Sequence, residues 1–291
     1  MEIIIGKNAG FCYGVERAVN KTIEEAKKDK VFCLGEIVHN QNVINYLKEQ
    51  GLRLIDNIEE TSGKTIIRAH GVPKTVYQKA KDMNITLVDL TCPSVLKIHK
   101  IAEQYSKKDY FIIITGKYNH PEIIGIESCC GSKYKIIGEK EEIPNLLKQI
   151  QDENKILLIS QTTYSSKKFD DIVKILRQNI KSDVIFEIKK TICPSTEIRQ
   201  KETEEIAKKV DLMIIIGDKK SSNTNKLYEI SCKFCNNVLF IADYTQLDMK
   251  KIQDVQKVGI MAGASTPKED IIAVKQKILN TIYKFKEEFY A

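Results

Sequence analysis

The stretches "TCPSVLKIHK" at 91–100 and "TICPSTEIRQ" at 191–200 repeat one pattern, in which Cys-Pro-Ser follows a strand-like run and opens a helical one. Proline is tolerated in the first turn of a helix, so Pro93 and Pro194 each indicate a helix that starts directly after a cysteine. A third cysteine, Cys12 in "AGFCYGVERA", has the same kind of position. A helix N-terminus favours a thiolate over a thiol because it carries partial positive charge. The pattern therefore predicts three thiolate ligands at helix starts.

Strand-like and amphipathic helical segments alternate along nearly the whole chain, which is typical of parallel α/β sheets. Strands are predicted near residues 2–5, 31–34, 64–67, 85–89, 110–114, 134–137, 155–159, 184–187, 211–216, 237–241 and 257–261. Helices are predicted near residues 14–29, 40–50, 73–82, 94–107, 120–130, 165–180, 195–209, 222–235 and 267–288.

The spacing of the three cysteines predicts three similar α/β lobes, at 14–92, 93–193 and 194–291. The first two segments each end in a strand that leads into the next cysteine, and the strand that leads into Cys12 is the N-terminal one. We therefore expect residues 1–13 to complete the third lobe, with the lobes arranged around a pseudo-threefold axis. Ligand sites in open α/β sheets lie beyond the carboxyl ends of the strands. Three thiolates there would hold a central iron–sulfur cluster and leave one iron open to substrate.

The composition of the 291-residue chain is that of an ordinary soluble protein with two or three domains. It has no apolar run of membrane-spanning length and no leader-like start, so we expect a cytoplasmic protein. In a reducing compartment the eight cysteines are expected to be thiols, metal ligands or catalytic groups rather than disulfides. Five of them are interpreted as structural: Cys33, Cys129, Cys130, Cys232 and Cys235.

The net charge of +7 has two interpretations. It is either a solvated, lysine-rich surface or an attraction to an acidic partner, such as a phosphorylated substrate or an electron carrier. The lysines are interleaved with glutamates rather than clustered with aromatic residues, which does not favour binding to nucleic acid.

Three of the four histidines follow predicted strands in the first two segments: His39, His70 and His120. Their matching loop positions, in a chain so poor in histidine, indicate a shared ligand site. His99 falls within a predicted helix and is interpreted as structural or exposed. Glu122 follows His120 at a helix start, where it is either a dipole-favourable cap or, if it is buried, a proton donor.

Three loops rich in hydroxyl groups each follow a strand and enter a helix: "SQTTYSS" at 160–166, "GDKKSSNTNK" at 217–226 and "MAGASTPKE" at 261–269. Any one of them could simply cap its helix. Together, their hydroxyls, amides and helix N-termini suit a phosphate. Neither a P-loop nor a dinucleotide-binding glycine motif is present in the chain.

Taken in order, these motifs resemble the hydroxymethylbutenyl diphosphate reductase family of the non-mevalonate isoprenoid pathway, over essentially the whole chain. The resemblance is carried by "AGFCYGVERA", "GEIVHN", "RAHGV", "VDLTCP", "GKYNHPEIIG", "SQTTYS", "TICPSTEIRQ", "KSSNTN" and "MAGAS". It implies that Cys12, Cys92 and Cys193 ligate a [4Fe–4S] cluster. It also implies that Glu122 and Thr162 are catalytic. The implied substrate-binding residues are His39, His70, His120, Thr162, Ser221, Ser222, Asn223 and Ser265.

The implied reaction removes the allylic hydroxyl of 4-hydroxy-3-methylbut-2-enyl diphosphate, giving isopentenyl and dimethylallyl diphosphates, with protons from Glu122 relayed by Thr162. Without a nucleotide-cofactor motif, the chain is expected to use a ferredoxin or flavodoxin as electron donor, and neither nucleic acid nor membrane as partner. Two alternatives remain. A metal-dependent hydrolase with zinc on the three histidines leaves the cysteine repeat unexplained, and an iron–sulfur redox sensor or nucleic-acid binder leaves the histidines and hydroxyls unexplained.

Overall fold

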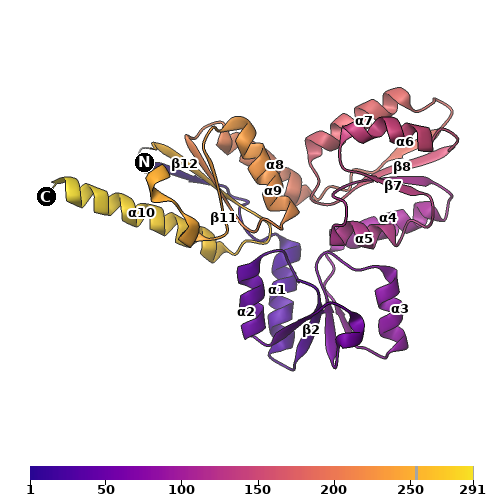
Figure 1. The fold of residues 1–291 in the computed structure, drawn as a ribbon, viewed down its shortest axis with the longest axis horizontal. Coiled ribbons are helices and arrows are strands. Elements are labelled where there is room, and N and C mark those ends of the chain that lie inside the picture. Colours follow the sequence, from indigo (N-terminus) through magenta and orange to yellow (C-terminus); the bar gives the residue numbers. More distant parts are fainter. Residues whose placement is uncertain (253–254, 291) are drawn as a thin grey trace. The chain divides into compact units, whose positions relative to one another are not determined.

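The computed structural model describes residues 1–252 and 255–290, and within them the strands form three parallel sheets of four strands each (Figure 1). Sheet A has the order β1 (Glu2–Ile5), β12 (Lys257–Ala262), β10 (Leu212–Ile216), β11 (Val238–Ile241). Sheet B has the order β3 (Leu52–Ile55), β2 (Val31–Leu34), β4 (Lys64–Ile67), β5 (Leu87–Asp89). Sheet C has the order β7 (Tyr134–Ile137), β6 (Phe111–Thr115), β8 (Lys155–Ser160), β9 (Ile185–Ile188). The predicted parallel α/β architecture is confirmed.

Except after β3 and β11, whose described links carry only 3₁₀ helices, successive strands are connected by α-helices, and a last α-helix follows β12. They are α1 (Tyr13–Ala26), α2 (Gln41–Glu49), α3 (Lys74–Asp82), α4 (Pro93–Ser106), α5 (Pro121–Glu127), α6 (Ile143–Gln149), α7 (Ser166–Asn179), α8 (Pro194–Ala207), α9 (Ser222–Phe234) and α10 (Lys268–Tyr290). None of the described helices is both long and apolar enough to cross a membrane.

Two short elements were missed by the sequence analysis, which placed no strand at β3 and no helix at α6. Strand β3 has only four residues, and its second, Arg53, is exposed. Helix α6 has seven residues, of which Ile143 and Leu146 are buried. Other strands of four residues, such as the continuously apolar β2, were predicted, so the charged, exposed Arg53 is what obscured β3. Helix α6 presents only two buried residues, fewer than the equally short α5, which buries Ile123, Gly125 and Ile126.

The interior strand β6 of sheet C shows why its residues 111–114 are all apolar. In β6, Ile112 and Ile114 pack in one apolar cluster with residues of α4 and α5, whereas Ile113 packs in another with residues of α6 and α7. Successive side chains of a strand point to opposite faces, so helices on both faces require apolar residues at every position. Burying each such side chain contributes roughly 1.5–3 kcal/mol.

The chain forms two compact units. The sheet-A unit consists of Met1–Glu16, His39–Asn45 and the residues from Pro194 onward. The sheet-B/C unit consists of Arg17–Val38 and Tyr46–Cys193, with sheets B and C. In sheet A, β1 pairs in parallel with β12, so the start and the last third of the chain share one sheet. The lobe boundaries expected from the cysteine spacing stay a prediction.

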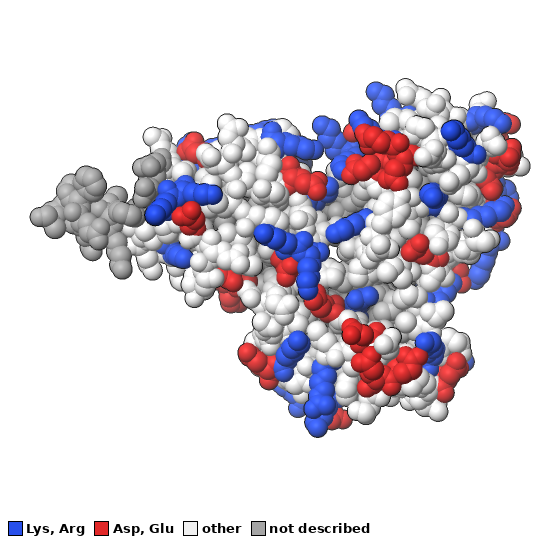
Figure 2. All heavy atoms as spheres, in the orientation of Figure 1, with Lys and Arg blue, Asp and Glu red and all other residues white. Residues whose placement is uncertain are grey.

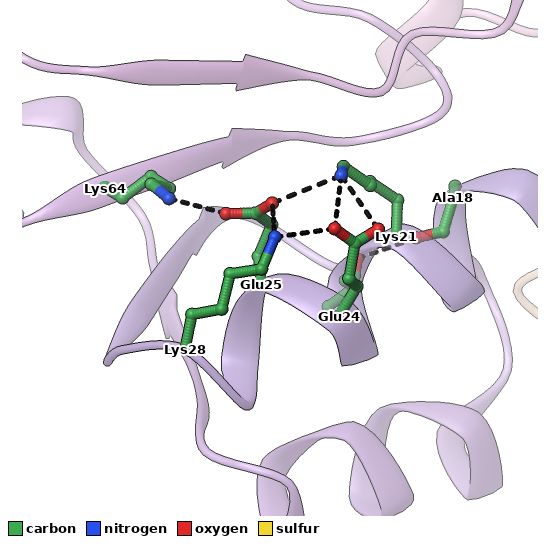
Figure 3. Close-up of polar contacts among 7 residues, drawn as sticks. Ala18, Lys21, Glu24, Glu25, Lys28 and Lys64 are labelled. Carbon is green, nitrogen blue, oxygen red and sulfur yellow. Dashed lines mark hydrogen bonds and ion pairs between the residues drawn. The ribbon is translucent and has the colours of Figure 1, made fainter.

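In the sheet-B/C unit, an ion-pair network joins the end of α1 to β4 (Figure 3). The Glu25 carboxylate lies 2.5 Å from Nζ of Lys64 and 3.3 Å from Nζ of both Lys21 and Lys28. The hydrogen bond from Lys64 is the main cause that lowers the pKa of Glu25 to about 2. The network therefore holds the helix against the sheet with a carboxylate that stays ionised at neutral pH.

Candidate active site

Each of the three predicted cluster cysteines donates its backbone N–H to a carbonyl just past the end of a strand. The pairs are Cys12 with Ala264 (3.2 Å), Cys92 with Ala69 (3.0 Å) and Cys193 with Thr162 (3.0 Å). Each acceptor residue either is a predicted substrate-binding residue or directly precedes one. The backbone therefore ties every predicted metal ligand to a predicted substrate contact in the same unit.

The predicted helix starts are confirmed: α1, α4 and α8 each begin with the residue that follows one of these cysteines. Cys92 is the N-cap of α4, and the hydroxyl of Ser94 on that helix donates to Sγ of Cys193 at 3.7 Å. All three cysteines are thiols and are partly exposed. A set of thiols at helix N-termini fits a group held by thiolates, such as an iron–sulfur cluster.

In the sheet-B/C unit, Glu122 on α5 is 1% exposed, and its carboxylate accepts two hydrogen bonds from Thr162. Thr162 donates its backbone N–H to one carboxylate oxygen and its hydroxyl to the other, both at 2.7 Å. Burial raises the pKa of Glu122 to about 7, although the two bonds from Thr162 pull it down. Of the two interpretations of Glu122, this environment favours a group that exchanges a proton near neutral pH.

Two of the three predicted histidines lie together in the same unit. His120 caps α5, and its Nδ1 accepts the backbone N–H of Glu122 at 3.1 Å. The neutral His120 ring therefore carries its proton on Nε2. The ring of His70 meets it edge-on, with 5.4 Å between the ring centroids. This pair can donate hydrogen bonds to an anion beside the Glu122 carboxyl.

The third histidine belongs to the sheet-A unit, where it adjoins another predicted substrate contact. The hydroxyl of Ser265 donates to the backbone carbonyl of His39 at 2.9 Å. Ser265 follows β12 and His39 precedes α2, so tertiary structure unites two motifs from opposite ends of the sequence.

The N-terminus of α9 supplies the remaining predicted substrate contacts in the sheet-A unit. Ser221 is the N-cap, Ser222 is the first residue of the helix, and Asn223 is 3% exposed. Among the described residues, neither atom of the Asn223 side-chain amide finds a hydrogen-bond partner. A buried amide left unpaired at a helix N-terminus suits an anionic ligand that would complete it.

Glycine allows the start of α9 to approach sheet A closely. A Cβ at Gly263, after β12, would lie 2.0 Å from Oγ1 of Thr224. At Gly217, where φ is +146°, a Cβ would lie 2.8 Å from the same atom. Side chains at either position would push the helix N-terminus away from the strand ends.

Of the two interpretations of His99, structural or exposed, the structure supports the structural one. A Cβ at Gly125 of α5 would lie 2.9 Å from Nε2 of His99, and one at Gly71 would lie 3.1 Å from its Cε1. His99 therefore packs between the segment that carries His70 and the helix that carries Glu122. Burial lowers the pKa of His99, which favours the neutral ring. The glycines that give it room were the only signal in the sequence.

The five remaining cysteines are mostly what the sequence analysis expected. Cys33, Cys129, Cys130 and Cys235 are buried. Cys232 is exposed, so its interpretation as a small buried hydrophobe was wrong.

Three parallel sheets, with thiols, histidines and a buried carboxyl in the loops and helix starts that follow the strands, define the class of protein: an α/β protein with a candidate thiolate-held metal site. Comparison with known proteins gives its family. The family described as LytB protein matches residues 3–279, so the chain belongs to that family.

Relatives in the family have a more particular name. A 4-hydroxy-3-methylbut-2-enyl diphosphate reductase from Caldanaerobacter subterraneus subsp. tengcongensis is 41% identical, covering 96% of each chain. The reductase of the same name from Thermoanaerobacter sp. (strain X514) is 39% identical, also covering 96% of each.

Solved structures agree with these relatives. The structure of (E)-4-hydroxy-3-methyl-but-2-enyl diphosphate reductase, the terminal enzyme of the non-mevalonate pathway, is 34% identical with a TM-score of 0.69, covering 96% of this chain and 100% of that one. The Plasmodium falciparum E-1-hydroxy-2-methyl-but-2-enyl-4-diphosphate reductase is 27% identical with a TM-score of 0.84, covering 96% of this chain and 87% of that one.

Proposed function

We propose that this chain is a cytoplasmic reductase of 4-hydroxy-3-methylbut-2-enyl diphosphate. Two electrons and two protons remove the allylic hydroxyl as water and yield isopentenyl diphosphate and dimethylallyl diphosphate. One set of contacts supports this function above all, because Thr162 joins a metal ligand to a proton donor. Its carbonyl accepts the N–H of Cys193, while its own N–H and hydroxyl bind Glu122.

The three cysteines at the helix starts are the residues that would hold the cofactor. As in its family, we propose an iron–sulfur cluster, here of the [4Fe–4S] type with Cys12, Cys92 and Cys193 as its only protein ligands. When bound, such a cluster supplies single electrons and an iron with an open site, which is a Lewis acid for an oxygen ligand.

The protein's own part begins with the proton. With a pKa of about 7, the Glu122 carboxyl is protonated in a sizeable fraction of molecules at neutral pH. The Thr162 hydroxyl, 2.7 Å from the carboxylate, is placed to pass that proton to the departing hydroxyl group. Protonation turns a poor leaving group into water, which is general acid catalysis.

The diphosphate end of the substrate needs donors and positive charge. In the sheet-B/C unit these are His70, His120 and Thr162, and in the sheet-A unit they are His39, Ser221, Ser222, Asn223 and Ser265. The unpaired amide of Asn223 would gain partners on binding, and the positive end of α9 favours the anion. Holding the diphosphate fixes where the allylic hydroxyl lies, which is a proximity effect.

The electrons would come from an acidic one-electron carrier of the ferredoxin or flavodoxin kind. The net charge of +7 supports an acidic partner. On the face shown in Figure 2, basic and acidic side chains are interspersed rather than gathered by sign. On this face the attraction would therefore come from the overall excess of basic residues rather than from a dense patch.

The two alternative functions lack comparable support. A zinc hydrolase would not use the three N–H contacts that tie the cysteines to the strand ends. A redox sensor would not need a carboxyl buried beside a histidine pair. The related proteins carry the name of the reductase.

The test is anaerobic turnover of the allylic diphosphate with a chemical one-electron donor, followed through the two diphosphate products. Replacing Cys12, Cys92 or Cys193 with Ser should each abolish turnover and deplete the iron and the visible absorption of the purified protein. Cys232→Ser, at an exposed cysteine, serves as the matched control and should keep both. Colourless wild-type protein, or cluster loss in the control alone, would overturn the assignment.

A further inference from the structure

Two arginines hold the chain segments that lead into two of the cysteines. Arg199 lies on α8 in the sheet-A unit and is 3% exposed. Its Nε donates to the carbonyl of Asn8 at 2.8 Å, and its Nη2 donates to that of Gly10 at 3.0 Å. Both carbonyls belong to the loop that ends at Cys12. One guanidinium thus fixes this loop against the helix that follows Cys193.

Arg17 repeats the arrangement in the sheet-B/C unit. It lies on α1, the helix that follows Cys12. Its Nη2 donates to the carbonyl of Leu90 at 3.1 Å and to that of Thr91 at 2.8 Å. These are the last two carbonyls before Cys92, so the guanidinium fixes the approach to that cysteine.

A third contact, from the Ser94 hydroxyl to Sγ of Cys193, involves the remaining cysteine-headed helix, α4. The helix after Cys12 holds the segment before Cys92, the helix after Cys92 contacts Cys193 through Ser94, and the helix after Cys193 holds the segment before Cys12. We propose that Arg17 and Arg199 are positioning residues that set the Sγ atoms of Cys92 and Cys12 before any cluster is bound.

The physical reason lies in the guanidinium group. In Arg199 it acts as a rigid planar fork, because Nε and Nη2 bind two carbonyls at a fixed separation. Arg17 reaches its two carbonyls with Nη2 alone, and the guanidinium plane fixes the direction of that atom, whereas a lysine ammonium is a single point on a flexible stem. The Cys12 loop needs such a fork, because Gly10 has a φ of +97° and a backbone shape that an ordinary residue rarely adopts. Glu202, also on α8, adds to the hold by accepting the N–H groups of Lys7 and Asn8 at 2.6 Å and 3.0 Å.

The experiment uses the full-length protein without cluster, so that its readout does not depend on activity. Alkylation rates of individual cysteines are measured by mass spectrometry in Arg199→Lys and Arg17→Lys. Arg199→Lys should raise the alkylation rate of Cys12 about fivefold, which is the effect expected from losing the net stabilisation of one hydrogen bond. The alkylation rate of Cys92 should not change. Arg17→Lys should do the reverse.

Two controls separate positioning from general loss of stability. On the same helix, the hydroxyl of Thr203 donates a buried hydrogen bond of 2.7 Å to the carbonyl of Arg199, and Thr203→Val removes it. This variant should lower the melting temperature without a selective change in the alkylation rate of Cys12. Cys33, which is fully buried, reports global opening in every variant. If Cys12 and Cys33 gain reactivity together, or if neither arginine variant is selective, the proposal is wrong.

The inference rests on the proposed function, because it assumes that these cysteines are cluster ligands, yet the two can fail separately. The lifetime of the cluster in the presence of a chelator, measured by visible absorption, should be shorter in both arginine variants than in Thr203→Val. A wild-type protein that holds no cluster would defeat the proposed function and leave the alkylation pattern standing. A stable cluster with unselective alkylation would defeat the positioning role alone.

Discussion

At the scale of single residues, Glu122 is the group whose environment departs most from water. A carboxyl with 1% exposure is normally neutral or paired with a cation, and here its partners are the N–H and hydroxyl of one threonine. These two bonds stabilise the ionised form, while burial stabilises the protonated form and has the larger effect. Both forms are therefore accessible near neutral pH, as proton transfer requires.

Turnover should accordingly decrease at alkaline pH. Only the protonated carboxyl can donate, so kcat/KM, which reports the free enzyme, should fall by about tenfold per pH unit above a pH near 7. The measurement is a pH–rate profile with a small reductant whose own potential does not vary with pH. A rate that stays level to pH 9 would remove Glu122 from the rate-limiting proton transfer.

Glu122→Gln separates the chemistry of this group from its effect on stability. The amide keeps the shape but carries no transferable proton, so turnover should fall by about 10²–10⁴-fold with the visible spectrum retained. The folded-state pKa is raised from 4.5 to about 7, so the folded state binds more protons than the unfolded state in that window.

Wild-type stability therefore decreases as pH rises from about 4.5 to about 7 and does not recover above it. The Gln variant lacks this loss and should gain stability relative to wild type between pH 4 and pH 8, as measured by urea unfolding of the cluster-free protein. A parallel pH dependence in the two proteins would mean that the carboxyl is not buried in solution.

Thr162→Val tests the hydroxyl of the pair. The bond from Oγ1 to the carboxylate lowers the pKa of Glu122, so its loss should raise that pKa and move the alkaline limb of the pH–rate profile to higher pH. Turnover below pH 7 should also fall, because the relay is gone. Thr163→Val at the neighbouring position is the control and should leave the limb in place.

At the scale of elements, helix α5 orients the Glu122 carboxyl, the proposed proton donor, and its position depends on its contact with α4. His99 of α4 fills the space that Gly125 of α5 leaves open. His120 starts α5 and Glu122 lies in its first turn, so a shift of this helix moves both residues together. The fit between a ring and a glycine therefore sets the geometry of the proton donor from several residues away.

Gly125→Ala should destabilise the protein by about 1–3 kcal/mol, the usual cost of overpacking. The added Cβ would lie 2.9 Å from Nε2 of His99, so His99→Ala should relieve the strain. The double variant should then lose less stability in urea unfolding than the sum of the single variants. Gly63→Ala, whose Cβ would have a nearest contact of 3.5 Å, is the matched control. Strict additivity would show that the two residues do not compete for space.

At the scale of the whole molecule, the excess of positive charge should matter for association with a protein partner and not for the chemistry. Surface charges are screened over a distance of about 8 Å at physiological salt and about 3 Å at 1 M. The net charge of +7 should therefore speed the encounter with an acidic carrier only at low ionic strength.

Turnover with a ferredoxin or flavodoxin should fall steeply as salt is added, because association slows. Turnover with a small chemical reductant should change much less. The comparison is made on one preparation with both donors over the same salt series. The same salt dependence for the two donors would mean that the +7 is only a solvated surface.

The sequence by itself determined the alternation of strands and helices, the helix starts behind Cys12, Cys92 and Cys193, and the motifs that carry the family resemblance. These features follow local rules, namely apolar periodicity and proline in the first helical turn, so residues close together in the sequence determine them. The same rules missed β3, which the exposed Arg53 interrupts, and α6, which buries only Ile143 and Leu146.

Only the tertiary structure decided the burial of Glu122 and its bonds to Thr162, the position of His99 between two glycines, and the hold of Arg17 and Arg199 on the cysteine segments. Each of these contacts joins residues from separate elements, such as Arg199 with Gly10, 189 positions apart. No local periodicity encodes such a pair. It forms because parallel sheets bring the carboxyl ends of distant strands to one edge, where helix starts and loops from different parts of the chain meet.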